Sequence, residues 1–357
     1  MPDQTPTPDS LNTFHSLAEL HERLSALGAG PAHERRVYRA WMGRIKWEEA
    51  AESRRLRLPK AVAEALPGIR GALRNAAVIR SRHPGADPES ERLLLTLSDG
   101  QTIESVLLPR QGVCVSTQMG CAVGCVFCMT GRCGLIRQLS DIEIVAQAAI
   151  ARELRPETKK VVFMGMGEPS HNLKNVLHAV EFLAQMGDFG QKDLVISSVG
   201  DERLFDALFA STVRPALAVS LHTTNDEKRR ELLPRGARMA VPRIIGRAEE
   251  WARTTGYPVQ YEWTLMHGVN DSFEEIDRLA DLLQGKYAMV NFIPVNAVED
   301  SPWVRPERAH AVELVRRLRS RGVIATLRDS AAQDVDGGCG QLRARVLKSE
   351  RGENQND

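Results

Sequence analysis

Three cysteines, Cys121, Cys125 and Cys128, stand close together in the segment GCAVGCVFCMTG. Their C-x3-C-x2-C spacing offers three thiolates, whereas each iron of a [4Fe–4S] cluster needs a ligand of its own. Three protein ligands therefore leave one iron open to a small molecule that can chelate it. The pattern predicts an iron–sulfur site with one open coordination position, and it narrows the function more than any other feature of the chain.

A zinc site is the main alternative for this triplet. Structural zinc takes four protein ligands, and Cys114, Cys133 or Cys339 could supply the fourth. Zinc ribbons, however, favour repeated C-x2-C pairs. The triplet also directly follows a predicted strand at 113–117, and parallel α/β folds bind their ligands at the carboxyl ends of strands. We therefore favour the iron–sulfur interpretation and assign no role to Cys133.

Other predicted strands also end in residues that suit a ligand. The segment VVFMGMGEP places Gly167 and Glu168 at a strand end, where glycine lets the main chain approach a ligand closely. Each such residue alone is typical of an ordinary turn or cap. Their recurrence on successive strand ends predicts a ligand-binding rim that also includes Ser197, Ser220, His222 and Asn296.

Cys339 lies far downstream, in the segment DVDGGCGQL. A lone cysteine is most often an inert core residue, but three neighbouring glycines indicate an accessible loop. Cys114 could likewise be an interior residue of its strand. From spacing alone, both interpretations stay open for both residues.

The elements that must position these residues begin at about residue 113. Repeated strand–helix units are typical of a parallel α/β sheet, and about six units are too few for a closed eightfold barrel. We therefore predict an α/β fold with a partial (β/α)6-type barrel over 113–345. Its predicted strands are GVCVST, KKVVFMGM, DLVISSV, PALAVSLH, PVQYEWTLM, AMVNFIPV and VIATLR.

The flanking segments have different patterns. Residues 1–15 are polar and proline-rich, which predicts disorder, and 16–90 are charged with helical periodicity. We predict that 16–90 form a small helical domain, RNA-binding-like because of the basic run SRRLRLPK, although such runs are more often solvated faces. Residues 91–112 alternate around an Asp-Gly pair, which predicts a hairpin carrying Glu104. A polar tail is expected at 346–357.

Composition limits the class of protein. The 357 residues carry a net charge of +1, so RNA binding would depend on local patches rather than a general positive field. Five of the six cysteines cluster between Cys114 and Cys133, unlike a secreted disulfide scaffold. The chain has no apolar run long enough for a membrane span and no start typical of a secretory signal. We expect a cytoplasmic protein that does not enter membranes.

The chain resembles the RlmN/Cfr group of radical SAM RNA methyltransferases. The pairing of CVSTQMGC with a late CGQL is specific to this group, and the matching stretches run in family order from about residue 35 to 345. Pro169, in MGMGEP, favours the RlmN branch. The stretches are DGQTIESVLLP, CVSTQMGCAVGCVFCMTGRCGLIRQL, FMGMGEPSHNLKNV, SSVGD, SLHTTNDEKRRELLP, GVNDS, NFIPVN and DVDGGCGQL.

The resemblance implies two cofactors, a [4Fe–4S] cluster and S-adenosylmethionine (SAM). Cys121, Cys125 and Cys128 would bind the cluster, and SAM would chelate the open iron. The positions that match SAM contacts in the family are Gly167, Glu168, Ser197, Ser220, Leu221, His222 and Asn296.

The resemblance also implies a mechanism that uses two cysteines and two SAM molecules per turnover. Cys339 would first be methylated, and a 5′-deoxyadenosyl radical would then take a hydrogen atom from that methyl group. The methylene radical would add to an sp2 carbon of adenine, with Glu104 as proton acceptor. Cys114 would attack the Cys339 sulfur, form a disulfide and release the methylated base.

The implied substrate is C2 of an adenosine in 23S rRNA, with tRNA as a second candidate. C8 methylation, as in Cfr, and action on another RNA remain alternatives, as do a metal-stabilised RNA-binding protein without catalysis and a radical SAM enzyme for a protein or small molecule. The expected partners are RNA and an external one-electron reductant such as flavodoxin. Nothing in the sequence indicates an oligomer, so we expect a monomer.

Overall fold

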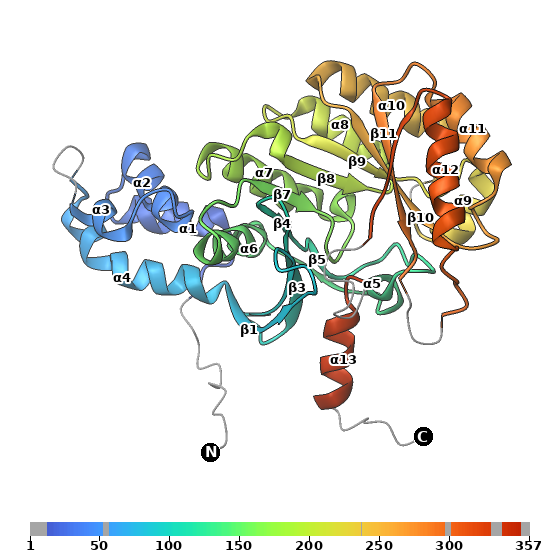
Figure 1. The fold of residues 1–357 in the computed structure, drawn as a ribbon. Helices are drawn as coiled ribbons and strands as arrows, with labels where there is room; N and C mark the ends of the chain where they lie inside the picture. Colours follow the sequence, from blue (N-terminus) through green and yellow to red (C-terminus); the bar gives the residue numbers. More distant parts are fainter. Residues whose placement is uncertain (1–12, 53–56, 237, 297–300, 330–337, 351–357) are drawn as a thin grey trace.

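The computed structural model describes residues 13–52, 57–236, 238–296, 301–329 and 338–350. A group of helices comes first in the chain and lies at one side of the barrel (Figure 1). Phe182 of the barrel anchors it, because the rings of Tyr38 and Trp41 pack against Phe182 with centroids 5.2 and 5.6 Å away. These helices are α1 (Leu17–Ala26), α2 (Pro31–Trp41), α3 (Trp47–Glu52) and α4 (Lys60–Asn75).

Ten strands form one sheet in the order β1-β2-β3-β4-β7-β8-β9-β10-β11-β12. The pairs among β1 to β4 are antiparallel, and every pair from β4 to β12 is parallel. The strands are β1 (Ala77–Pro84), β2 (Glu91–Leu97), β3 (Thr102–Leu108), β4 (Gly112–Cys114), β7 (Lys160–Phe163), β8 (Leu194–Ser198), β9 (Ala216–Ser220), β10 (Val259–Leu265), β11 (Ala288–Pro294) and β12 (Ile324–Leu327). In the described part of the chain β1 and β12 are the two ends of the sheet, so the predicted partial barrel is confirmed.

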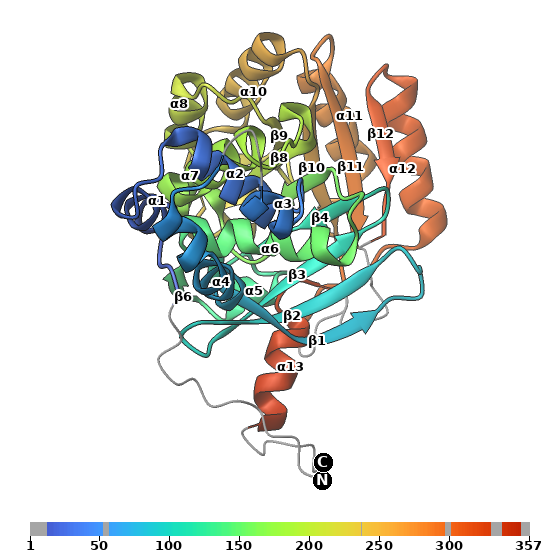
Figure 2. The same ribbon diagram turned by 90° about the vertical axis from the view of Figure 1, so that its left-hand side faces the viewer.

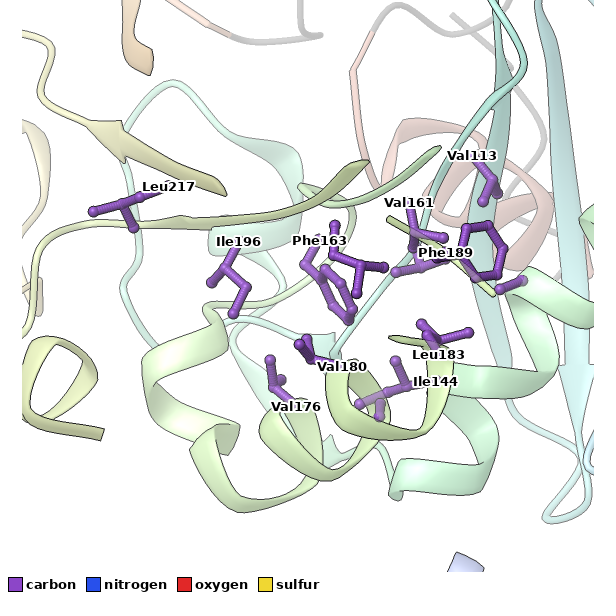
Figure 3. Packing of buried hydrophobic residues seen from close by; sticks show 14 of the residues in the cluster. Val113, Ile144, Val161, Phe163, Val176, Val180, Leu183, Phe189, Ile196 and Leu217 are labelled. Carbon is purple, nitrogen blue, oxygen red and sulfur yellow. The ribbon is translucent and has the colours of Figure 1, made fainter. Parts of the chain in front are cut away.

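Helices cover the outer face of the parallel strands (Figures 1 and 2). Successive strand residues point to opposite faces of a sheet, so each parallel strand can bury an outward and an inward set. Figure 3 shows part of the outward set, in which Phe163 and Ile196 point toward Val180 and Val176 of α7. The covering helices are α6 (Asp141–Leu154), α7 (Leu173–Gln185), α8 (Glu202–Ala210), α10 (Val241–Thr255), α11 (Phe273–Leu283) and α12 (Arg308–Ser320).

The strand side chains that point inward are mostly small, and one of them is the predicted catalytic residue Cys114. Cys114, Val162, Val195 and Ala218 form a separate buried cluster, to which Met164 contributes. The strand residues of this cluster are small, whereas larger residues such as Phe163 and Ile196 fill the outer face. The alternation of the strand sequences thus places Cys114 inside the barrel.

Short elements frame the loop that carries the three clustered cysteines. A two-stranded ladder joins β5 (Gln118–Gly120) to β6 (Leu135–Gln138), and the short helix α5 (Met129–Arg132) lies between them in the chain. The remaining elements are η1 (Pro169–Asn172), η2 (Gln191–Asp193), α9 (Asp226–Leu232) and α13 (Gln341–Glu350). Although α13 ends the described chain, it packs against β3 and α5 (Figure 1).

Two predictions about the flanking segments were wrong in part. Residues 77–84 form β1, not helix; one face of this edge strand is exposed, so its sequence lacks the apolar content of a buried strand. Residues 346–350 continue α13 rather than a frayed tail, since the first turn of that helix is docked on β3. Predicted disorder at 1–12, the basic positions 54 and 55, and the tail from 351 lie outside the described residues.

No helix in the described ranges combines the length and apolar content that crossing a bilayer requires.

Candidate active site

The loop that carries Cys121, Cys125 and Cys128 is fixed by main-chain hydrogen bonds to distant segments. The amide of Cys121 donates to Gly134 (3.0 Å), and the amide of Val126 donates to Leu232 (3.1 Å). The indole of Trp303 donates to the Val126 carbonyl at 3.0 Å. The three thiols are therefore held by a loop whose course is determined by the barrel around it.

Glycine is required at two positions of this loop. Gly120 has a φ of 77°, and a Cβ there would lie 1.8 Å from the Gly134 carbonyl oxygen. A Cβ on Gly131 would lie 2.9 Å from the amide nitrogen of Cys125. Real Cβ atoms do not approach backbone so closely, so both glycines allow the loop to fold onto itself.

The surroundings of the three thiols disfavour their charge. Burial raises the pKa of Cys121 to about 12, and burial together with the other two thiols raises the pKa of Cys125 well above its ordinary value. The pKa of Cys128 is also raised, chiefly by burial. Thiolates are the metal-binding form, so a strongly positive group is needed to stabilise all three, as iron in a cluster would be.

The donor set fits a cluster better than a single ion. Among the described residues, no group of three or more His, Cys, Asp or Glu side chains converges closely enough to bind one metal ion. A [4Fe–4S] cluster presents a separate iron to each thiolate, so its ligands need not converge on a point. Cys133, the alternative nearby ligand for zinc, is exposed at the end of α5.

The side chain of Glu168 is held by three hydrogen bonds at the rim. Its carboxylate accepts hydrogen bonds from the Ser198 hydroxyl (2.5 Å), the Val199 amide (3.1 Å) and the Ser170 amide (3.1 Å). Gly167 before it has a φ of 106°, and a Cβ there would meet the side chain of Gln118 at 2.6 Å. The predicted Gly-Glu pair thus forms a rigid corner with a buried carboxylate.

The serine that contacts this corner is Ser198, which the sequence did not indicate. Its neighbour Ser197, predicted as a residue of the ligand-binding rim, faces the opposite side of the strand, and its role stays a prediction. Ser197 pairs in register with Ala218 and shares the inward face with Val195. It is half-buried, as expected of a residue that lines the barrel.

His222 links the rim to the cysteine loop. Its φ is 64°, in the left-handed region that is uncommon for a residue with a side chain. Its Nδ1 accepts the Thr264 amide at 3.0 Å, and its ring makes an edge contact with Phe127, with centroids 4.9 Å apart. Burial and the neighbouring Arg229 lower the pKa of His222 to about 3, so the ring is neutral at physiological pH with its proton on Nε2.

Two buried residues that the sequence analysis did not single out hold this rim together. Arg229 donates to the carbonyls of Ser220 (3.1 Å) and Leu221 (3.3 Å). Asn270 donates to the carbonyls of His222 and Thr264, each at 2.7 Å. Arg229 and Asn270 lie in SLHTTNDEKRRELLP and GVNDS, two of the stretches that carry the family resemblance. That resemblance was the only feature of the sequence that pointed to them.

Cys339 and Cys114 meet inside the barrel although they are far apart in the chain. The Cys339 thiol lies 3.8 Å from the Met164 carbonyl oxygen, and the Cys114 thiol is also hydrogen-bonded to the main chain of Met164. Burial raises the pKa of Cys339 to about 11 and that of Cys114 still further. All six cysteines are free thiols in the structure.

The Cys339 segment is docked by several contacts. The Thr130 hydroxyl donates to the Cys339 carbonyl at 2.7 Å and so joins it to the cysteine loop. Glu104 accepts the Arg343 amide at 2.8 Å and pairs with Arg92 at 2.9 Å. The Asn296 amide lies close to Gly338, since a Cβ there would be 3.7 Å from its nitrogen.

The structure thus gathers the predicted residues into one region. Gly167 and Glu168 follow β7, Ser197 is in β8, Ser220 ends β9, and Leu221 and His222 come directly after it. Asn296 follows β11. Of the three predicted catalytic residues, Cys339 contacts the cysteine loop through Thr130, and Glu104 and Cys114 lie near Cys339. Their individual roles stay predictions.

Comparisons with known proteins identify the class. Residues 115–283 match the family model of the radical SAM superfamily. The chain is 56% identical over 333 residues to a probable RNA methyltransferase of Azoarcus sp. (strain BH72), covering 93% of this chain and 95% of that protein. It is also 56% identical to a probable RNA methyltransferase of Thiobacillus denitrificans, covering 93% and 91% of the two chains.

A solved structure matches nearly the whole chain. It is a radical SAM methyltransferase from Sphaerobacter thermophilus, with 34% sequence identity and a TM-score of 0.81. The match covers 94% of this chain and 100% of that one.

The protein is therefore a radical SAM enzyme, whose cofactors are a [4Fe–4S] cluster and SAM. Within that superfamily it belongs to the family of radical SAM methyltransferases that these relatives represent.

Proposed function

We propose that the protein is an RNA methyltransferase of the RlmN/Cfr group that methylates an sp2 carbon of adenine through a methyl group carried on Cys339. The main support is the meeting of two cysteines from distant segments. Cys339 and Cys114 share the main chain of Met164, and Glu104 is buried beside them. The relatives named probable RNA methyltransferases support RNA as the substrate.

The chemistry of adenine explains why such a site is needed. Its C2 and C8 carbons lie between nitrogens, are electrophilic and have no lone pair to attack a sulfonium methyl group. When bound, the cluster and SAM supply a carbon radical that can remove a hydrogen atom from a methyl group, and the protein orients the reactants. Cys121, Cys125 and Cys128 would hold the cluster, and Glu168 and His222 would line the SAM site.

Cys339 would act as the methyl carrier. Its sulfur, after losing a proton, forms a bond to the methyl carbon while the bond from that carbon to the sulfonium breaks. The Thr130 and Arg343 contacts hold the segment that bears this sulfur close to the cysteine loop. Glu104 would accept the proton that the adenine carbon loses on substitution, and the unpaired electron left by the radical addition would pass to the external one-electron carrier.

Cys114 would complete the cycle. Its thiolate attacks the Cys339 sulfur, a disulfide forms, and the bond from sulfur to the methylene carbon breaks. The electron pair goes to the released carbon, which takes a proton and becomes the new methyl group. A thiol reductant must then reduce the disulfide before another turnover.

The proposed target is C2 of an adenosine in 23S rRNA, with tRNA as a second substrate. Pro169, typical of the RlmN branch, supports C2 over C8. The base must leave its stack to reach the barrel interior, which favours a loop or single-stranded region. We propose a cytoplasmic monomer that receives electrons from an external donor such as flavodoxin.

Nucleoside mass spectrometry tests the assignment. RNA from cells that lack the protein is incubated anaerobically with the reconstituted enzyme, SAM and a reductant, then digested. We expect 2-methyladenosine. Detection of 8-methyladenosine alone would overturn the C2 assignment, and an unmodified RNA pool would overturn the choice of RNA.

Two cysteine variants test the carrier mechanism. Cys339→Ala is expected to abolish RNA methylation while SAM cleavage stays measurable. Cys114→Ala is expected to leave protein covalently attached to RNA, visible as a shifted band on a denaturing gel. Wild-type methylation by the first variant, or no adduct with the second, contradicts the mechanism.

A further inference from the structure

Arg92 is a buried arginine that lies beside the proposed carrier cysteine. It is in β2, and both it and Glu104 are 2% exposed, with 2.9 Å between Nη1 of Arg92 and Oε2 of Glu104. Glu104 is in β3, where it lies diagonally across the ladder from Arg92, whose direct partner is Val106. A buried charge is costly without a partner, so the pair forms a fixed unit of the sheet.

This pair contacts the chain on both sides of Cys339. Nη1 of Arg92 also donates to the Gly338 carbonyl at 3.3 Å, one residue before the cysteine. Oε1 of Glu104 accepts the Arg343 amide at 2.8 Å, in the first turn of α13. The side chain of Arg343 in turn donates to the Thr102 carbonyl at 2.7 Å. The antiparallel strands therefore fix the position of the cysteine from two directions.

Four charged or ionisable groups lie around the Cys339 sulfur, and together they affect how readily its thiol ionises. Arg92 is the positive group, and it favours the thiolate by charge and by a hydrogen bond. Glu104 and the Cys128 thiol oppose ionisation, and the buried Cys114 thiol faces the same arginine. Burial opposes ionisation most strongly. Arg92 is thus the group that offsets an otherwise unfavourable setting for a nucleophilic sulfur.

We propose that Arg92 is a positioning residue that holds Cys339 beside Cys114 and stabilises the negative charge on its sulfur as it accepts a methyl group. The inference rests on the proposed function of Cys339. The thiol proton leaves to solvent, the sulfur lone pair forms the bond to carbon, and the sulfonium leaves with the electron pair of the broken bond. The guanidinium faces the sulfur that carries the charge before transfer.

Substitutions at Arg92 can separate charge from geometry. Arg92→Lys keeps the positive charge, but an ammonium lacks the planar fork that reaches Glu104 and the Gly338 carbonyl together. Arg92→Met removes the charge at similar size. Arg152→Met is a matched control, since Arg152 is also buried and donates to main-chain carbonyls, but those of Met42 and Thr158 in another part of the fold.

The test measures alkylation of Cys339 in the anaerobic holoprotein without RNA. Iodoacetamide labelling is followed by peptide mass spectrometry at several pH values from 6 to 10, below the raised pKa of Cys339, where the labelling rate is proportional to the thiolate fraction. We expect Arg92→Met to lower the labelling rate about tenfold at each pH, which corresponds to a shift of about one pH unit. Arg92→Lys should stay near the wild-type rate, and Arg152→Met should match it. A labelling rate for Arg92→Met equal to that of Arg152→Met overturns the proposal.

A second measurement reports the methyl-carrying step. After incubation with SAM, the methylated fraction of Cys339 should fall about tenfold in Arg92→Met and less in Arg92→Lys. If Arg92→Met does not fold, Arg92→Gln keeps a donor toward Glu104 and takes its place. Wild-type protein without any methyl-Cys339 would contradict the proposed function itself, whereas equal methylation of wild type and Arg92→Met contradicts only the role of Arg92.

Discussion

The two cysteine-bearing regions of this site are built in different ways. Cys121, Cys125 and Cys128 lie within one short loop, and backbone contacts and tight glycines set the path of that loop. Cys339 belongs to a segment from the far end of the chain, held by side chains of β2, β3 and α5. The cysteines of the first region are brought together by their spacing in one loop, which distant segments then hold in place, whereas the position of Cys339 depends wholly on long-range docking.

Under the proposed function, this difference has a chemical reason. A cluster needs its ligands at fixed distances from one another, and a short loop provides this because few residues separate the cysteines. A group carrier must approach a cofactor, a base and a second thiol in turn, which a separately attached segment permits. Changes in the loop should therefore remove the cofactor, whereas changes in the docking contacts should slow transfer and leave the cofactor in place.

The largest effect is expected for Cys125→Ala. Loss of one of three ligands should reduce iron from about four per chain to nearly none and abolish formation of 5′-deoxyadenosine. The decrease should exceed about a thousandfold, or about 4 kcal/mol in activation free energy. Iron analysis and product chromatography measure it. Cys133→Ala is the matched control, because Cys133 is exposed and should retain iron and activity. Equal iron loss in both variants would contradict the ligand assignment.

Asn270→Ala should weaken the rim beside the loop. One side chain makes three hydrogen bonds there, two to the carbonyls of His222 and Thr264 and one from the Met266 amide. At about 1 kcal/mol each, their loss should lower the free energy of unfolding by about 3 kcal/mol. The KM for SAM should rise more than kcat falls, because His222 would no longer be held in its left-handed conformation. Denaturant unfolding and SAM cleavage kinetics measure the two effects.

Glu262→Gln should change the pH dependence of the free energy of unfolding without altering either cysteine region. Burial raises the pKa of Glu262 to about 7 from an ordinary value of 4.5, although a hydrogen bond from Asn291 opposes the shift. The folded protein thus retains a proton that the unfolded chain releases, so stability falls as pH rises through that window and the loss is complete above about 7.

The Glu262→Gln variant has no ionisable group at this position, so its free energy of unfolding should lack this fall with rising pH. Glutamine can still accept the Asn291 hydrogen bond, so at pH 8 the variant should be more stable than wild type, by up to about 3 kcal/mol. Urea unfolding at pH 5 and pH 8 gives the comparison. A difference between the two proteins that does not change with pH would contradict a raised pKa at Glu262.

The smallest effect is expected for Thr130→Val, which removes the hydrogen bond to the Cys339 carbonyl and a side-chain contact with the Cys128 thiol, while all three cysteines of the loop remain. A loss of about 1 kcal/mol should reduce methylation of Cys339 about fivefold, with iron content unchanged. Thr158→Val, in which a hydroxyl bound to main-chain carbonyls is removed elsewhere, is the control. Loss of iron in Thr130→Val would show that the two regions are not built independently.

Much of the fold could be predicted because its signals are local. All seven predicted parallel strands are present, since apolar strand segments and amphipathic helices alternate in the sequence. Strand β1 was missed because one of its faces is exposed and its apolar content is low. Ser198, the partner of Glu168, was not identified from the sequence, because the face on which a strand residue lies depends on register, which the sequence alone leaves open.

The sequence by itself determined the triplet Cys121, Cys125 and Cys128, because ligand spacing within one loop is set by the number of intervening residues. It also determined that polar residues would gather at one edge of the sheet, since parallel strands share a carboxyl edge. Only the tertiary structure brought Cys339 close to Cys114 in space. It also placed Arg92 and Glu104 where they hydrogen-bond the main chain on both sides of Cys339. Such contacts depend on how β1 to β3 extend the barrel and where α13 packs, and these are long-range outcomes that no local pattern encodes.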